Sequence, residues 1–184
     1  MRRDGAANRE KVLRAAEQVF AENGAAASTD EVARRAGVSI ATVFRNFATK
    51  QDLIEATAAR HLEKLTAEAV RIADGPDAGR AFATLFRTLA MAGPVKMSLL
   101  DLLPPHEDDG TGLSPSVTEA ADAFHAALDG ALRRAQAAGA ARPEVTGDDI
   151  SFLLRALAHA TRAGEGESLD RAVGVVLDGL RVPH

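Results

Sequence analysis

The sequence STDEVARRAGVSIATVFRNFATK, residues 28–50, decides the fold of this chain. Its spacing predicts a short helix, a glycine turn, a second helix over residues 40–46 and the start of a third helix. Gly37 suits the turn because it has no Cβ, and small or apolar side chains occupy the positions where two crossed helices pack together. These side chains are Val32, Ala33, Ala36, Val38 and Val43. The pattern is typical of a helix-turn-helix that enters DNA.

Three start signals accompany this pattern. Ser28 and Glu31 have the spacing of a capping box, in which the serine oxygen accepts a hydrogen bond from a free backbone amide of the first turn. Ser39 is suited to cap the second helix, and a threonine followed three residues later by an acid, Thr49 and Asp52, opens a longer helix. Three aligned signals predict the motif more specifically than any one of them.

The same region resembles the TetR family of bacterial transcriptional repressors, over roughly residues 9–53. The family pattern is an apolar first helix ending in Asn-Gly, the helix-turn-helix, and an aromatic-x-x-Phe segment closely followed by lysine. The matching residues are Val12, Leu13, Ala16, Val19, Phe20, Asn23-Gly24, Ala36-Gly37-Val38-Ser39, Phe44, Phe47 and Lys50. Three positions depart from it: Ala41 replaces the usual Gly, Phe44 the usual Tyr, and Asn46 a common His or Tyr.

The resemblance implies an all-α fold of about nine helices. A three-helix DNA-binding domain is expected over residues 1–50, followed by a helical effector-binding and dimerisation domain over residues 51–184. Helical periodicity continues beyond the motif, with an apolar stripe over residues 50–72, a helix capped by Asp77 that runs to about Met91, and a helix opened by a Ser116–Glu119 capping box. Pro and Gly divide these segments, and the acidic stretch 106–115 is expected to be a mobile loop.

The expected DNA contacts lie on or near the second helix of the motif and at the helix starts beside it: Thr29, Ser39, Ile40, Ala41, Thr42, Phe44, Arg45, Asn46 and Lys50. Ser39 caps the helix or contacts a base, and Arg45 forks onto guanine or grips phosphate. Phe44 lacks the hydroxyl that the family's Tyr uses on phosphate, so packing or an apolar base contact is expected. Lys50 matches the lysine that the family places against the DNA backbone. Arg2 and Arg3, expected to precede the first helix, are an alternative minor-groove arm.

Composition limits the other possibilities. The chain has 184 residues, 46% of them hydrophobic, which is enough for a sizeable core. It contains no cysteine, no recognisable signal peptide and no apolar run long enough for a membrane span, so a cytoplasmic protein is expected. Residues 1–50 hold nine Lys or Arg and six Asp or Glu, a charge of +3 within a chain whose net charge is −4. The basic end coincides with the DNA-binding motif.

Two apolar stripes near the end of the chain indicate an interface. The resemblance implies that the last two helices pair with those of a second subunit in a homodimer, although the same stripes are also compatible with a core within one chain. The expected interface residues are Leu153, Leu157, Thr161, Val173, Val176, Leu177 and Leu180. A dimer places two helix-turn-helix motifs about 34–36 Å apart on one face of a duplex, which predicts a palindromic double-stranded DNA operator.

The middle helices carry a possible pocket for an apolar small-molecule effector. Its expected lining is Phe82, Phe86, Met97, Leu100, Phe124 and His125. Each apolar side chain is also compatible with ordinary core, and His125 with an exposed or otherwise satisfied histidine. Aromatic residues make up only 4% of the chain, with no Trp or Tyr, which excludes most stacking and phenolic contacts with a ligand.

Signatures of enzymes are missing from the sequence. The five histidines are scattered without metal-ligand spacing, and there is no glycine-rich phosphate loop or nucleophile elbow. We therefore expect no catalytic activity, no metal and no cofactor. The alternatives that stay open are a regulator that responds to no ligand and a helical small-molecule binding module without a DNA function.

Overall fold

The computed structural model describes residues 2–92, 102–103, 113–160 and 166–182. These residues form eight α-helices and one 3-10 helix, with no strand among them. None of the described helices combines the length and apolar character needed to cross a membrane. The all-α prediction is confirmed. The loop expected at 106–115 falls almost wholly outside the described residues.

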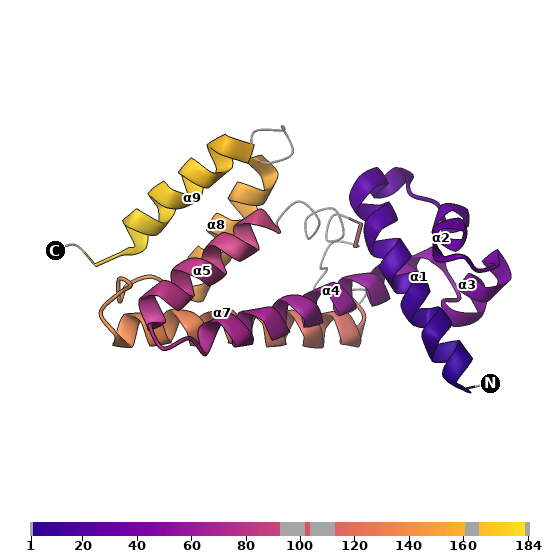
Figure 1. Ribbon diagram of the computed structural model, residues 1–184, viewed down its shortest axis with the longest axis horizontal. Coiled ribbons are helices and arrows are strands. Elements are labelled where there is room, and N and C mark those ends of the chain that lie inside the picture. Colours follow the sequence, from indigo (N-terminus) through magenta and orange to yellow (C-terminus); the bar gives the residue numbers. More distant parts are fainter. Residues whose placement is uncertain (1, 93–101, 104–112, 161–165, 183–184) are drawn as a thin grey trace. The chain divides into compact units, whose positions relative to one another are not determined.

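The chain divides into two compact units, and two helices, α4 (Lys50–Ala73) and α7 (Pro115–Ala137), each contribute residues to both (Figure 1). The described part of the first unit comprises residues 2–62, 102–103 and 113–120, and that of the second comprises residues 63–92, 121–160 and 166–182. The predicted domain boundary after residue 50 stays a prediction. Residue 50 is the start of α4, and the division between the two compact units falls within that helix, after residue 62.

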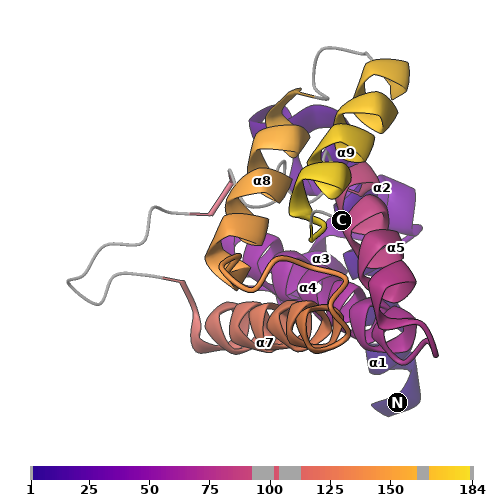
Figure 2. The same cartoon turned by 90° about the vertical axis from the view of Figure 1, so that its left-hand side faces the viewer.

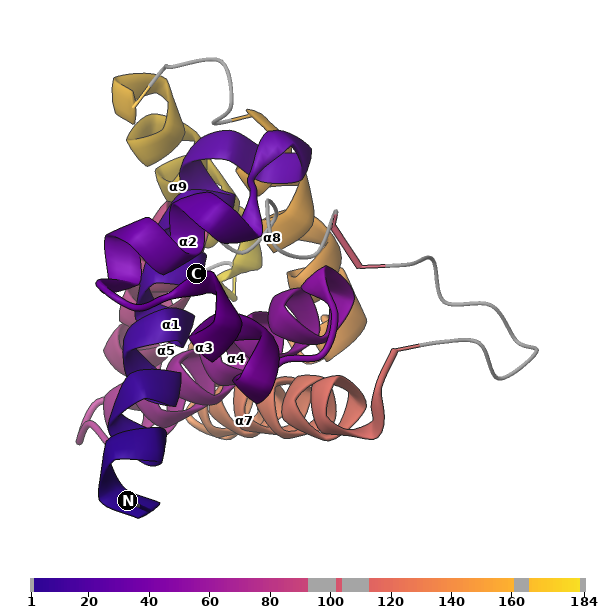
Figure 3. The ribbon, with the colours of Figure 1, turned by 90° about the vertical axis from the view of Figure 1, so that its right-hand side faces the viewer.

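The first unit contains α1 (Arg2–Asn23), η1 (Gly24–Ala26), α2 (Thr29–Ala36), α3 (Ile40–Asn46) and the first half of α4 (Lys50–Ala73). Helix α1 packs against α2 and α3 (Figure 3). The large side chains at its centre include Leu13, Val19, Phe20 and Val32, all almost completely buried. The prediction that Arg2 and Arg3 precede the first helix is wrong, since α1 begins at Arg2.

The second unit contains the rest of α4, α5 (Ala78–Met91), most of α7 (Pro115–Ala137), α8 (Gly147–Ala160) and α9 (Gly166–Leu180). Helices α5, α8 and α9 pack against one another (Figure 2). Asp77 caps α5 as predicted, with its Oδ1 accepting from the amide of Arg80 at 2.9 Å. Thr146 and Asp149 cap α8 reciprocally: the Asp149 carboxylate accepts from the Thr146 amide at 2.9 Å, and Thr146 Oγ1 accepts from the Asp149 amide at 3.3 Å.

The start of α7 corrects one expectation. The helix begins at Pro115, and the carbonyl oxygen of Ser114 accepts from the amides of Val117 and Thr118. Ser116 therefore lies in the first turn and does not cap the helix. The physical reason is Pro115, whose fixed φ and missing amide suit the first helical position.

Candidate nucleic-acid interface

The first helix of the motif is fixed at both ends. Ser28 Oγ accepts a hydrogen bond from the Glu31 amide at 3.2 Å, as the capping-box spacing predicts. The Glu31 carboxylate instead accepts from Asn23 Nδ2 at 3.0 Å, which ties α2 to the end of α1. A second tie is the ion pair between Arg35 and Glu22, at 2.7 Å. Helix α2 is therefore held to α1 by polar contacts as well as by apolar packing.

Gly37 makes the turn in the left-handed region, with φ 67° and ψ 35°. Its amide bonds to the Arg34 carbonyl and the Val38 amide to the Ala33 carbonyl, which satisfies the last carbonyls of α2. A Cβ built on Gly37 would meet no atom within 4 Å. Backbone conformation, and not space, is therefore what requires glycine here.

Helix α3 has the predicted bounds, Ile40–Asn46, and its polar side chains bond locally. Ser39 Oγ accepts from the Thr42 amide at 3.2 Å and also lies 2.9 Å from Thr42 Oγ1. Arg45 Nη2 donates to Thr42 Oγ1 at 3.2 Å, and Asn46 Nδ2 donates to the Thr42 carbonyl at 2.7 Å. The capping role predicted for Ser39 is confirmed.

The outer face of α3 is open to solvent while its inner face is buried. Val43 on the inner face is 1% exposed, whereas Phe44 is 46% exposed, and Ala41 and Arg45 are also exposed. The ring of Phe44 is about half covered, so its position is compatible with both predicted roles, packing and an apolar base contact. Ile40, Thr42 and Asn46 are partly exposed. The α3 residues expected to contact DNA are thus all exposed or partly exposed and lie together along one short helix.

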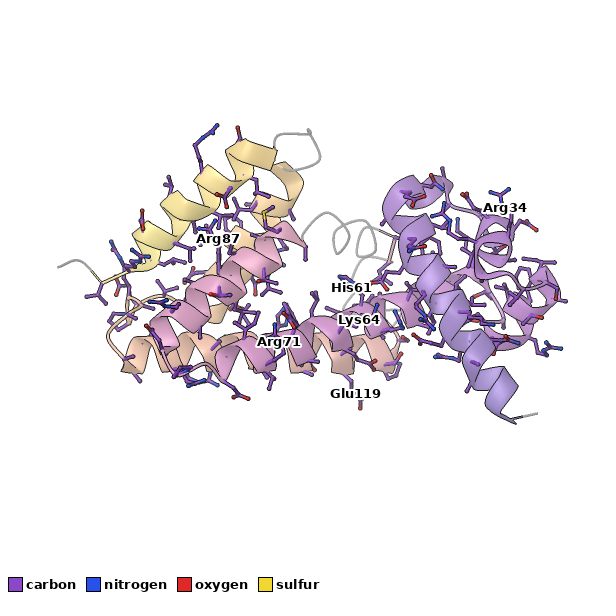
Figure 4. All side chains as sticks on the ribbon, viewed as in Figure 1. Arg34, His61, Lys64, Arg71, Arg87 and Glu119 are labelled. Atoms are coloured by element: carbon purple, nitrogen blue, oxygen red, sulfur yellow. The ribbon has the colours of Figure 1, made fainter. Side chains whose placement is uncertain are left out.

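The flanking candidates lie at two neighbouring helix starts. Thr29 is partly exposed at the first position of α2. Lys50 opens α4, and its Nζ donates to the Ala25 carbonyl at 3.3 Å. This exposed hydrogen bond holds the ammonium group beside the motif. Arg34, on the outside of α2, points away from the unit with a side chain that is 79% exposed (Figure 4).

A polar cluster between α1 and α4 was not predicted. Arg60 bonds to the carboxylates of Glu10 and Glu17, and His61 Nδ1 lies 2.8 Å from a Glu17 oxygen (Figure 4 labels His61). The hydrogen bond to Glu10 is the main cause that raises the pKa of Arg60 above its usual value. The sequence signal for this cluster is weak. The seven-residue spacing of Glu10 and Glu17 puts both carboxylates on one face of a helix, but it does not indicate that Arg60 and His61 are their partners.

The residues expected at the dimer interface divide between buried and partly exposed positions of the C-terminal helices. Four of the expected interface residues are buried within the chain itself: Leu157, Val173, Leu177 and Leu180 are at most 9% exposed. Leu153 and Val176 are partly exposed, and Thr161 lies outside the described residues. The large apolar side chains left open on these helices are Phe152, 65% exposed, and Val175, 73% exposed.

The expected effector lining is only partly brought together. Phe82, Phe86 and Phe124 are at most 4% exposed within the second unit, and His125 is exposed. Met97 and Leu100 lie outside the described residues. A hollow of about 430 Å³ within this unit has Phe82, Leu177 and Leu180 in its lining, beside Arg80 and Arg181. No group of three His, Asp or Glu side chains positioned for a metal occurs in the described parts of the chain.

Comparison with known proteins agrees with this geometry. Residues 12–57 match the family model described as bacterial regulatory proteins, tetR family, and residues 77–182 match the SbtR-like C-terminal domain of transcriptional regulators. The chain belongs to the TetR family of DNA-binding transcriptional regulators. The curated relative YvkB, an uncharacterised HTH-type transcriptional regulator of Bacillus subtilis, is 46% identical over 52 residues, and the match spans only 28% of either protein.

Solved TetR-family structures cover nearly the whole chain. A regulator from Mycobacterium vanbaalenii is 34% identical, with a TM-score of 0.75 over 98% of this chain and 99% of that one. A regulator from Streptomyces coelicolor is 27% identical, with a TM-score of 0.76 over 96% and 99%. FadR from Bacillus subtilis, crystallised with stearoyl-CoA, is 17% identical with a TM-score of 0.68 over 92% and 95%, which shows a shared fold alone.

Proposed function

We propose that this TetR-family protein is a repressor that binds a palindromic operator as a homodimer and is released by an apolar small molecule. The observation that carries the proposal is the outer face of α3, which exposes Phe44 and Arg45 on a helix fixed by Ser39 and Gly37. An exposed helix of this kind fits a major groove. A two-fold dimer then requires a two-fold sequence in its operator.

The proposed contacts divide by chemistry. Arg45 has a planar guanidinium that pairs with guanine O6 and N7, and its exposed position leaves these donors accessible. Phe44 offers an apolar ring to a thymine methyl group. Thr29, Thr42 and Lys50 provide hydroxyl and ammonium groups for phosphates, which set position more than sequence. Ser39, Ile40, Ala41 and Asn46 border the same surface.

The first experiment measures binding of Arg45→Ala. Fluorescence anisotropy with a duplex selected by the protein from random DNA compares the variant with wild type, and an unrelated duplex serves as reference. Losing a base contact is expected to cost about 1–3 kcal/mol per half-site and to reduce the preference for the selected duplex. Arg34→Ala, also exposed but on α2, is the matched control. If wild type showed no preference for any duplex, the DNA-binding proposal would fail.

The proposed homodimer forms through the outer faces of α8 and α9. Phe152 and Val175 support this assignment, because large exposed apolar side chains commonly mark interaction surfaces. Phe152→Asp is expected to raise the dimer dissociation constant at least about tenfold, since it places a charge in a desolvated interface. Sedimentation equilibrium measures the change, and Arg133→Asp on the exposed side of α7 is the control. An unchanged dimer in Phe152→Asp would reject this surface.

The proposed effector acts by binding better to a conformation that disfavours DNA. The apolar lining of the second unit supports an apolar ligand, and the shared fold with FadR, which carries stearoyl-CoA, supports a ligand-responsive second domain. Stearoyl-CoA and fractionated apolar extracts of the source cells are to be added to the operator complex. Release by one fraction is expected. Operator binding that no fraction changes would favour the second candidate, a regulator that responds to no ligand.

A further inference from the structure

Arg9 lies beside the reading helix although it belongs to α1. Its guanidinium carbon is 5.1 Å from the centre of the Phe47 ring, and Phe47 is the C-cap residue that directly follows α3. The Arg9 side chain is exposed, whereas Phe47 is 4% exposed. A guanidinium placed over a ring is attracted by its negative face. This contact fixes a positive charge next to the C-terminal end of α3.

The arginines of the first unit differ in their partners. Among those with described side chains, four form ion pairs with glutamates: Arg14, Arg34, Arg35 and Arg60. Two have no carboxylate within 4.0 Å among the described residues. These two are Arg45 on α3, which bonds to a threonine hydroxyl, and Arg9. The charge of Arg9 is therefore not neutralised by an acidic neighbour. The same is true of Arg45, the main candidate for a DNA contact.

The position of Arg9 suits the edge of a groove. Figure 3 shows α1 running beside α3, with its N-terminal end continuing past it. When a helix lies in the major groove, the phosphates of the two strands border it on either side. If α3 occupies the groove, a positive group that flanks its end lies on the side where a phosphate strand runs.

We propose that Arg9 is a DNA-backbone contact, binding a phosphate next to the end of α3. The inference rests on the proposed DNA binding and adds a contact that comes from α1. The Arg9 side chain is exposed beside the ring, and the N–H groups of a guanidinium match the oxygens of a phosphate. Because Phe47 holds the group in place, less side-chain freedom is lost on binding.

The test compares Arg9→Gln with Arg9→Lys over a range of salt concentrations. A dimer has two such contacts, so Arg9→Gln is expected to lower affinity about tenfold. It is also expected to reduce the slope of log affinity against log salt by about 2. The loss is expected to be equal for the selected duplex and an unrelated one, since phosphates carry no sequence information. Arg9→Lys keeps the charge and is expected to retain most of the salt slope.

Lys11→Gln is the matched control, because it removes one exposed positive charge from the same helix about 200° around its axis. Thermal unfolding of each variant shows whether α1 still packs. The inference is overturned if Arg9→Gln keeps the wild-type salt slope, or if Lys11→Gln loses as much affinity. A wild-type protein that binds no duplex would instead reject the proposed function, so the two failures are distinguishable.

Discussion

The helix pair α2–α3 and the helix pair α8–α9 use apolar residues in opposite ways. In α2–α3 the buried stripe holds the motif together, and the exposed face is mostly polar with a single large ring, Phe44. In α8–α9 the stripe is also buried within the chain, yet the outer face still exposes Phe152 and Val175. In both pairs the apolar stripe is largely core, and the apolar side chains left outside it on α8 and α9 are the ones that we propose for association.

The largest test of this comparison uses two valines that are two residues apart on α9. Val173 is 0% exposed and Val175 is 73% exposed. Val173→Asp is expected to destabilise the fold by about 4 kcal/mol or more, because it buries a charge without a partner. Val175→Asp is expected to change the stability of the separated subunit by less than about 0.5 kcal/mol and to weaken the dimer.

Urea unfolding followed by circular dichroism, at matched protein concentrations, measures both valine variants, and sedimentation gives their association state. Leu177→Asp, 7% exposed in the wild type, is expected to behave like Val173→Asp. A folded Val173→Asp protein that had lost only its dimer would restore the original assignment of the stripe to the interface.

The second test concerns the turn on which the α2–α3 pair depends. Gly37→Ala is expected to cost about 1–2 kcal/mol, because an L residue at φ 67° is strained even where its Cβ meets no atom. Gly130→Ala, in the interior of α7 with equally open space, is the control and is expected to stabilise the protein by up to about 1 kcal/mol. Equal effects of the two substitutions on urea unfolding would show that the turn conformation is not what requires glycine.

Sequence predicted the motif well because its determinants are local. The bounds of α3, the caps at Ser28, Ser39 and Asp77, and the start of α4 all depend on residues within four positions of one another. The cluster that joins Arg60 to Glu10 crosses fifty positions and became visible only when α1 packed on α4. The expected interface set stays a prediction for a related reason. Helical periodicity shows which face is apolar, but not how much of it the chain itself covers.

The smallest expected effect on stability comes from the acidic residue at a helix start. The α2–α3 pair and the α8–α9 pair use this residue differently. At α8 the Thr146 amide bonds to the Asp149 carboxylate, and this bond is the main cause that lowers the pKa of Asp149. At α2 the corresponding acid of the capping box is Glu31, and its carboxylate accepts a hydrogen bond from the side chain of Asn23. Charge at Asp149 therefore supports its own helix start, whereas charge at Glu31 supports a contact between helices.

A carboxylate whose pKa is lowered in the folded state stabilises that state above the unfolded pKa, and the contribution is lost as pH falls through the folded value. Asp149→Asn is thus expected to lower the melting temperature slightly above about pH 4, by less than Gly37→Ala does. The difference from wild type is expected to shrink as the solution is acidified further. Calorimetric melts of both proteins from neutral pH downward measure it. A difference that grows on acidification would mean that the charged form of Asp149 does not stabilise the start of α8.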